Sequence, residues 1–265
     1  MAAIEPMEQF MIQKIVNFPS FTIPGVGVVD MSITNSVFFM LLTVGLITAF
    51  FLACAKRQLV PDRMQAMAEM IYGMVDNTLT GGIIGDRGRP YLPFVFSLFM
   101  MIAMMNLLGL MPGGFTVTSQ LAVTATLAVV TFALVLIVGF AKNGLGFFKL
   151  FWPSGMHPAM SAFLMVIEMI SFLIRPFTLA LRLFGNMLGG HVVVYIFGSF
   201  VVGLGLFGLS GFGLNTLGLL GSGLSFAMVL ALTALDFIIA LIQAFVFSAL
   251  TCVYLNEVLN LDHGH

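Results

Sequence analysis

The run from residue 158 to 200 is almost uniformly apolar, yet it contains Glu168, Arg175 and Arg182. Its length of about 40 residues is roughly twice the ~20 that a helix needs to cross a bilayer. We therefore expect either one strongly tilted helix or a helix kinked at Pro176. A guanidinium near the bilayer centre costs ~2.5–3.5 kcal/mol on insertion scales, and arginine does not lose its proton in proteins. This cost indicates that Arg182 has a function.

The composition excludes an ordinary soluble protein. Apolar residues make up 60% of the 265 residues and charged residues 8%, against ~45–50% and ~25% in soluble domains. We predict an all-α polytopic membrane protein forming a single membrane domain over residues 1–265. Cys54 and Cys252 lie at the ends of apolar runs without metal-type spacing, so we interpret them as buried small apolar residues.

The order of the apolar segments predicts five transmembrane helices. Each segment is long enough to cross about 30 Å of hydrocarbon. The expected elements are a first span at 36–56, a helical hairpin at 91–111 and 118–140, and two long tilted helices at 158–200 and 224–259.

Other segments are too polar to span the membrane. The N-terminal segment 1–35 has apolar residues at helical spacing over 5–18, which predicts a short amphipathic helix at the interface. Residues 61–80 combine polar side chains with an apolar stripe, so we expect a second interfacial helix there. Residues 81–89 are expected to form a polar turn, and the glycine-rich residues 203–223 a connection between the two long helices.

The loop cations predict the orientation. Seven loop cations lie in the two connections that follow the first and the third predicted spans, and both connections are on the same side of the membrane. These cations are Lys56, Arg57, Arg63, Arg87, Arg89, Lys142 and Lys149. The opposite loops, 112–117 and 201–223, contain no Lys or Arg. The positive-inside rule makes the cation-rich side cytoplasmic, with the N-terminus outside and the C-terminus inside.

Polar residues at membrane depth form a pattern on the two long helices. At ~100° per residue, Glu168, Arg175, Arg182 and Asn186 fall within about 60° of each other. The two helices are antiparallel, so residue counting places Gln243 near the level of Arg182. The same counting, at about 1.5 Å per residue, also gives the depths in the membrane of the His191–Asp236 pair and of Glu168.

His191 and Asp236 are expected about 10–14 Å toward the outside of Arg182, and Glu168 about 21 Å toward the cytoplasm. Histidine and carboxylates exchange protons, whereas arginine does not. A fixed cation between titratable groups resembles two half-channels with a block between them.

Each of these residues also has a structural interpretation. Arg182 could be an anchor paired with Asp236 or a carbonyl, and Arg175 could simply pair with Glu168. His191 is as well suited to interhelical hydrogen bonding as to proton relay, and amide side chains at depth are commonly contacts between helices. The amides concerned are Asn106, Asn186 and Gln243. With no phosphate loop, metal-spaced Cys/His cluster or nucleophile with its base in the sequence, we expect no cofactor, no metal and no nucleic-acid partner.

Four motifs carry a family resemblance. They are ALRLFGNMLGGH (180–191), ALIQAFVFSALTCVYL (240–255), MMNLLGLMP (104–112) and EMISFLIRP (168–176). Together they resemble subunit a of the rotary F-type ATP synthases, over roughly residues 90–260. Two departures are Gly109, where relatives often have Asp, and the glycine-rich segment 203–223.

The resemblance implies roles for individual residues. Arg182 matches the essential arginine facing the rotating ring of c subunits, and Asn186 and Gln243 match its polar neighbours. Glu168 matches the carboxylate toward the cytoplasmic half-channel. His191 and Asp236 match a pair of residues that lines the outer half-channel in the family.

The function implied is that of a proton-conducting stator subunit that couples proton flow to rotation and ATP synthesis. The chain itself would be non-catalytic, because ATP chemistry lies in other subunits. Implied partners are the c-subunit ring, b-type subunits of the peripheral stalk, the rest of the complex, protons and the lipid bilayer. The location implied is the bacterial inner (plasma) membrane, with the mitochondrial inner membrane as the alternative.

Two other functions remain open at this point. A stand-alone proton-coupled transporter or channel could use the same polar groups, and it predicts an inverted repeat. The sequence has two long apolar segments but no duplicated half. A purely structural membrane scaffold is the other alternative, and the buried arginine counts against it.

Overall fold

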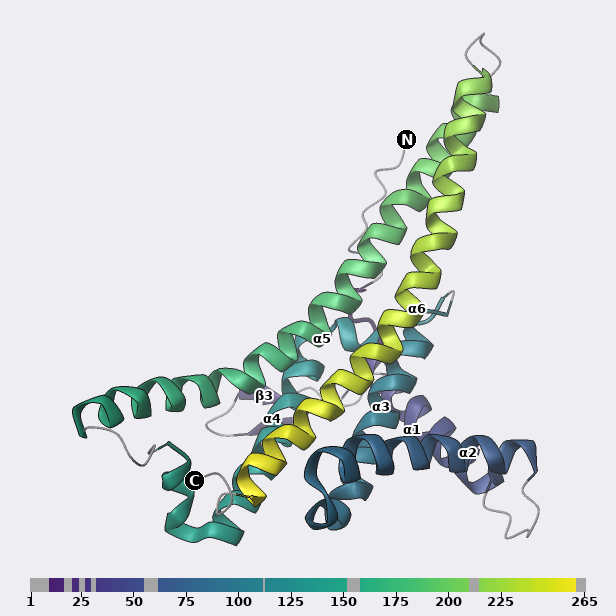
Figure 1. Ribbon diagram of the computed structural model, residues 1–265. Helices are drawn as coiled ribbons and strands as arrows, with labels where there is room; N and C mark the ends of the chain where they lie inside the picture. The colour runs from purple at the N-terminus through teal and green to yellow at the C-terminus, as the bar shows by residue number, and fades with distance from the viewer. Residues whose placement is uncertain are drawn as a thin grey trace. The chain divides into compact units, whose positions relative to one another are not determined.

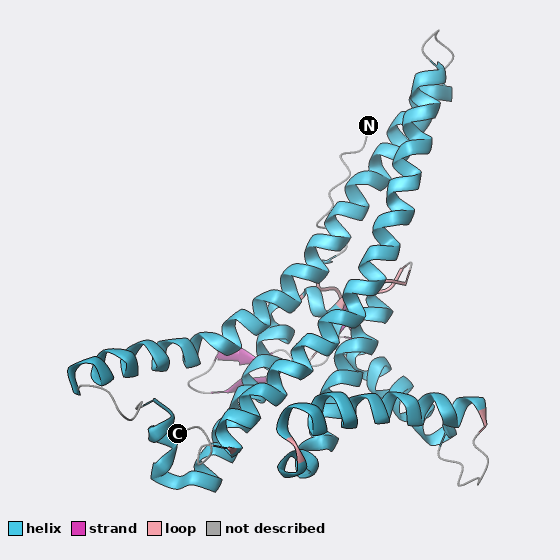
Figure 2. Ribbon diagram, viewed as in Figure 1, coloured by secondary structure: helices cyan, strands magenta, loops and turns pink. Residues whose placement is uncertain are grey.

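The computed structural model describes residues 10–16, 21–23, 27–29, 32–54, 62–111, 113–151, 158–209 and 215–260. Helices dominate this part of the chain (Figures 1 and 2). The five long apolar helices are α1 Asn35–Cys54, α3 Leu92–Gly109, α4 Leu121–Asn143, α5 Pro158–Leu209 and α6 Asn215–Leu259. By length and composition, five helices of the described residues can cross a membrane, which confirms the predicted all-α polytopic class.

The N-terminal segment differs from its prediction. Instead of an amphipathic helix, Lys14–Val16 forms strand β1, which pairs antiparallel with β4, Ile33–Thr34. The Asn35 side chain explains the difference, because it donates to the carbonyl of Met11 at 3.1 Å and accepts from the Gln13 amide at 3.3 Å. The helix prediction is therefore wrong for residues 11–16. Residues 5–9, 17 and 18 lie outside the described residues.

A second hairpin occupies the segment that follows. Strands β2, Phe21–Ile23, and β3, Gly27–Val29, pair antiparallel with Thr22 opposite Val28. The two hairpins thus form strands at 14–16, 21–23, 27–29 and 33–34 of the N-terminal segment (Figure 2).

The predicted surface helix 61–80 is longer and less regular than expected. Helix α2, Arg63–Met74, begins where the Asp62 carboxylate accepts from the Arg63 amide at 2.8 Å. It continues into π-helical turns over Val75–Ile84. The buried residues there are Val75, Leu79, Thr80 and Ile84. Their spacing of four or five suits i→i+5 turns better than a period of 3.6.

The turn expected at 81–89 begins only at Gly85. That glycine has φ +80°, a conformation that costs other residues energy. A 3₁₀ helix, Asp86–Tyr91, then leads into α3. Residues 81–84 are therefore helical, which corrects the prediction for the start of the turn.

The chain divides into two compact units. The first comprises residues 1–44, 104–120 and 184–242, and the second comprises 45–103, 121–183 and 243–265. Both long helices contribute one part to each unit. Helix α5 is continuous, with Pro176 inside it.

In the first unit, α5 and α6 run side by side toward the connection between them (Figure 1). A Cβ built on Gly218 would lie 2.9 Å from the Gly208 nitrogen and 3.1 Å from the Leu204 carbonyl oxygen. Small residues that let backbones approach are typical of membrane helix pairs. Residues 203–209 and 215–223 are thus helical, and the prediction of one long connection is wrong for them. Gly205, Gly218 and Gly221 face the other helix closely, whereas a Cβ on Gly203 or Gly223 would meet no neighbour. Residues 210–214 lie outside the described residues.

The second unit has a core of apolar and aromatic side chains. Phe172 of α5 packs against Phe132 of α4, with ring centroids 5.1 Å apart. Cys252 is fully buried, and Cys54 is 5% exposed, which confirms that both are buried. The C-terminal end of α6 is held by Asn143, whose side chain donates to the Val258 carbonyl at 2.8 Å.

Candidate functional site

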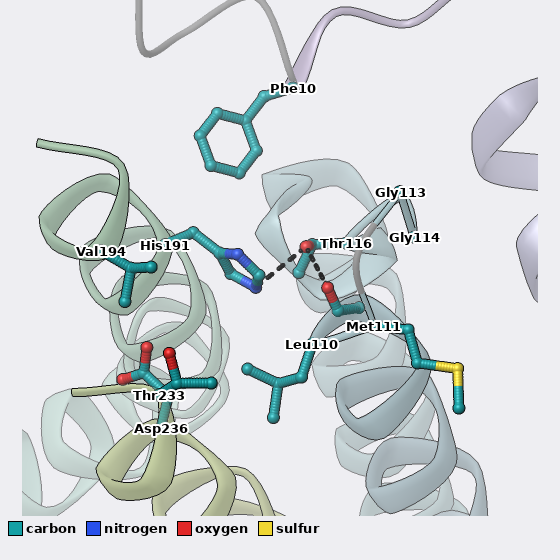
Figure 3. Close-up of a pocket in the computed structure, with 11 residues that line it drawn as sticks. Phe10, Leu110, Met111, Gly113, Gly114, Thr116, His191, Val194, Thr233 and Asp236 are labelled. Atoms are coloured by element: carbon teal, nitrogen blue, oxygen red, sulfur yellow. Dashed lines mark hydrogen bonds between the residues drawn. The ribbon is translucent and has the colours of Figure 1, made fainter. Parts of the chain in front are cut away.

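A cavity of ≈ 280 Å³ lies in the first unit between α5, α6 and the chain after α3 (Figure 3). His191 of α5 and Asp236 of α6 both line it, together with Thr116, Thr233 and Phe10. Counting residues along two antiparallel helices places His191 and Asp236 at similar levels. The structure brings them together on one cavity.

Thr116 holds the His191 ring. Its hydroxyl lies 3.1 Å from Nε2 of His191, and it also lies 3.4 Å from the carbonyl oxygen of Gly109, to which it can donate (Figure 3). The ring of Phe10 approaches His191 edge to face, with centroids 6.3 Å apart. The Phe10 carbonyl accepts a hydrogen bond of 2.9 Å from the Gln120 side chain, which anchors the N-terminal segment beside the cavity.

Asp236 lies directly against the backbone of α5. A Cβ built on Gly190 would lie 2.5 Å from Oδ1 and 2.8 Å from Oδ2 of Asp236. No side chain fits at position 190 unless this carboxylate moves. The glycine next to His191 therefore makes room for the acid on the facing helix.

Asn106 joins α3 to α6 inside the same unit. It is fully buried, and its Nδ2 donates to the Ala240 carbonyl at 3.1 Å. Its Oδ1 has no hydrogen-bond partner within the part of the chain that the structure describes. The hydrogen bond agrees with the interpretation of Asn106 as a contact between helices.

In the second unit, Arg175 is the centre of a charged cluster. Its guanidinium pairs with Glu168 at 3.7 Å and with Glu257 of α6. The same group lies over the rings of Phe172 and Tyr254, at 5.4 and 5.0 Å from their centroids. The predicted Arg175–Glu168 pair is confirmed, and Glu257 is an additional partner.

Arg182 has a different environment. It is exposed on α5, and among the described residues it makes no ion pair or hydrogen bond. Asn186, one turn further along α5, is exposed too, whereas Gln243 on α6 is 3% exposed. A permanently charged side chain thus lies on the outside of an apolar helix.

The comparison with protein families decides the identity. A family model described as ATP synthase A chain matches residues 37–256. The chain belongs to the ATP synthase A chain family. Members of this family named ATP synthase subunit a are similar over nearly their whole length. The protein of Rhodospirillum rubrum is 43% identical over 257 residues, 97% of this chain and 98% of the relative.

Two further relatives of that name give the same result. The protein of Mesorhizobium japonicum is 44% identical over 261 residues, which is 98% of each chain. That of Rhodopseudomonas palustris strain BisA53 is 43% identical over 264 residues, 98% of this chain and all of the relative. As an ATP synthase A chain with five apolar helices, the protein is a multi-pass membrane component of the ATP synthase complex. This membership disfavours the stand-alone transporter and the structural scaffold.

Three residues of these clusters do not follow from the sequence pattern alone, or were not predicted from it: Thr116, Gly190 and Glu257. Thr116 lies outside the helices, where periodicity gives no information. The role of Gly190 depends on the facing helix. Glu257 could have been found, because the residue count that places Gln243 at the level of Arg182 also places Glu257 at the level of Glu168.

Proposed function

We propose that the chain is the proton-conducting, non-catalytic stator subunit of an F-type ATP synthase, and that it offers two offset half-channels to a ring of c subunits. The observation that carries this proposal is the exposure of Arg182 on a membrane-spanning helix, with no acid paired to it among the residues that the structure describes. An unpaired charge in hydrocarbon costs several kcal/mol. A carboxylate of another chain would remove that cost.

His191 and Asp236 supply the outer half-channel in this proposal. The cavity that they line is large enough for several waters, and both side chains can take up and release protons. A proton arriving from outside neutralises a ring carboxylate, which can then move into lipid. Along α5, Asn186 comes between His191 and Arg182, and residue counting along α6 puts Gln243 near the level of Arg182.

Glu168 belongs to the cytoplasmic half-channel. After nearly a full turn of the ring, the carboxylate meets this side and releases its proton. Arg182 favours the ionised carboxylate by Coulomb attraction, which is strong where the dielectric constant is low. It also repels protons that would otherwise cross directly. The membrane potential drives the process with about 2.3 kcal/mol per charge per 100 mV.

The location and the other partners belong to the same proposal. The loop cations orient the N-terminus outside and the C-terminus in the cytoplasm, in a bacterial inner membrane. Peripheral-stalk b-type subunits hold the chain against rotation. Apolar side chains are exposed along the spans, among them Phe163, Ile170 and Phe177, and these suit contacts with lipid or with helices of the ring.

The test is ATP-driven proton pumping in inverted membrane vesicles that carry Arg182→Ala. Passive proton leak is measured in the same vesicles, and assembly is followed by co-purification of the complex. Arg63→Ala, an exposed arginine on α2, is the control for loss of a cation. We expect pumping to disappear with Arg182→Ala in an assembled complex and to persist in the control. Pumping that survives in assembled Arg182→Ala complexes would contradict the proposal.

A further inference from the structure

The environment of Thr116 restricts how its hydroxyl can be used. Thr116 is 4% exposed, so its hydroxyl must find partners within the protein or in ordered water. Among the described residues its Oγ1 has two hydrogen-bond partners, the Gly109 carbonyl oxygen at 3.4 Å and Nε2 of His191 at 3.1 Å. A hydroxyl has one hydrogen to donate and a carbonyl oxygen can only accept. When that hydrogen is given to Gly109, the contact with His191 requires Nε2 to be the donor.

We infer that Thr116 is a positioning residue that selects the His191 tautomer with hydrogen on Nε2, leaving the Nδ1 lone pair to accept a proton. The inference rests on the proposed function, because it assigns a direction to proton uptake in the outer half-channel. Thr116 does not carry the proton. It sets which nitrogen of His191 does so.

Thr116 is well placed for this role because its backbone and side chain are held from several directions. The side chain and amide of Ser119 both donate to the Thr116 carbonyl, at 2.6 and 3.2 Å. A Cβ on Gly109 would lie 3.0–3.2 Å from the Thr116 side chain and Cα. Glycine at position 109 therefore lets the threonine approach the end of α3.

Neutral histidine has two tautomers, and the partner of one nitrogen determines the role of the other. With Nε2–H bound to Thr116, Nδ1 becomes the proton acceptor and the resulting imidazolium keeps the same Nε2 hydrogen bond. Asp236, on the facing helix, is the acid that lines the same cavity. A ring free to exchange tautomers would present an N–H to the incoming proton part of the time, and that state cannot accept it.

The first readout is spectroscopic and uses the whole complex. Histidine labelled with ¹⁵N distinguishes the two tautomers by nitrogen chemical shift in solid-state NMR of the assembled enzyme in lipid. The chain has four histidines, and comparison with His191→Gln identifies the His191 signal. We expect the Nε2–H tautomer in the unmodified complex. An Nδ1–H tautomer there would overturn the inference, whether or not any variant assembles.

The second readout compares three threonine variants in inverted vesicles. Thr116→Val keeps the shape but removes the hydroxyl, and Thr116→Ser keeps the hydroxyl. Thr126→Val is the matched control, since Thr126 is exposed on α4 and donates only to the Ala122 carbonyl of its own helix.

We expect Thr116→Val to lower pumping about three- to tenfold, as loss of one selecting hydrogen bond implies. It should also give mixed tautomers at His191, while the serine variant and the control stay near the unmodified rate. Unchanged pumping and an unchanged tautomer in Thr116→Val would contradict the inference. The proposed function is tested separately, since pumping by Arg182→Ala would contradict it whatever Thr116 does.

Discussion

The carboxylate of Asp236 on α6 occupies the space that a side chain on Gly190 of α5 would need. A Cβ at position 190 would lie 2.5 Å from Oδ1 and 2.8 Å from Oδ2 of the acid. The two residues are adjacent only because the sequence has no side chain at one of them. The cavity lined by His191 therefore depends on close contact between the Asp236 carboxylate and the α5 backbone at Gly190.

Gly190→Ala should displace Asp236 from its position against α5. Overpacking of this kind costs about 1–3 kcal/mol, and we expect a marked loss of ATP-driven pumping in vesicles. Gly198→Ala is the control on the same helix, because apart from its chain neighbours and the nearby backbone of α5 no described residue lies within 4 Å of a Cβ built there. Equal pumping by the two variants would show that the position of Asp236 does not matter.

Arg175 and its two acids should act as one unit. Removing the arginine leaves Glu168 and Glu257 close together without a counter-charge, so Arg175→Met is expected to weaken the complex more than Glu257→Gln, which leaves the Glu168 pair in place. The thermal dissociation midpoint of the purified complex measures this. A double-mutant cycle should give a coupling of about 0.5–3 kcal/mol between Arg175 and Glu257. Strictly additive effects would rule out the pair as a stabilising contact.

Gly218→Ala should disturb the packing of α5 against α6. The added Cβ would meet backbone atoms of Gly208 and Leu204, which cannot rotate away as a side chain can. We expect a lower yield of assembled complex after mild heating in detergent. Gly203→Ala provides the comparison, since apart from its chain neighbours and the nearby backbone of α5 no described residue lies within 4 Å of a Cβ built there. A stable Gly218→Ala complex would mean that the backbones are not in close contact.

Asn106→Leu should have a small effect on stability. The variant loses the hydrogen bond to the Ala240 carbonyl, and such bonds between membrane helices average about 0.6 kcal/mol. It also removes a buried amide oxygen, which lessens the loss. We expect a nearly unchanged dissociation midpoint and nearly unchanged pumping. Loss of pumping in an intact complex would instead indicate that Asn106 takes part in proton transfer.

The parts of the fold that could be predicted are those that depend on apolar length and helical period. The five helices follow from runs too apolar for water, and the Arg175–Glu168 pair follows from a spacing of seven on one helix. His191 and Asp236 share a cavity because antiparallel helices place them at similar levels. Each of these inferences uses only local sequence and the geometry of one helix.

The errors concern contacts between distant residues. Residues 11–16 have a helical apolar pattern, yet Asn35 binds the backbone of Met11 and Gln13 and keeps it extended. The glycines near 205 and 218 have low helix propensity, yet the approach of two helices compensates for it. Thr116 lies in irregular chain, where no period predicts which side chain it meets. In each case the decisive partner lies far away in the sequence.

A rotating partner would push sideways on the helices beside it. Two helices that can slide past each other bend almost independently under such a load. Where the backbones of α5 and α6 meet at Gly208 and Gly218, close packing opposes sliding, so the pair bends as a single stiffer beam. If the ring turns as proposed above, close packing at these glycines would keep the spacing of His191 and Asp236 constant under the load.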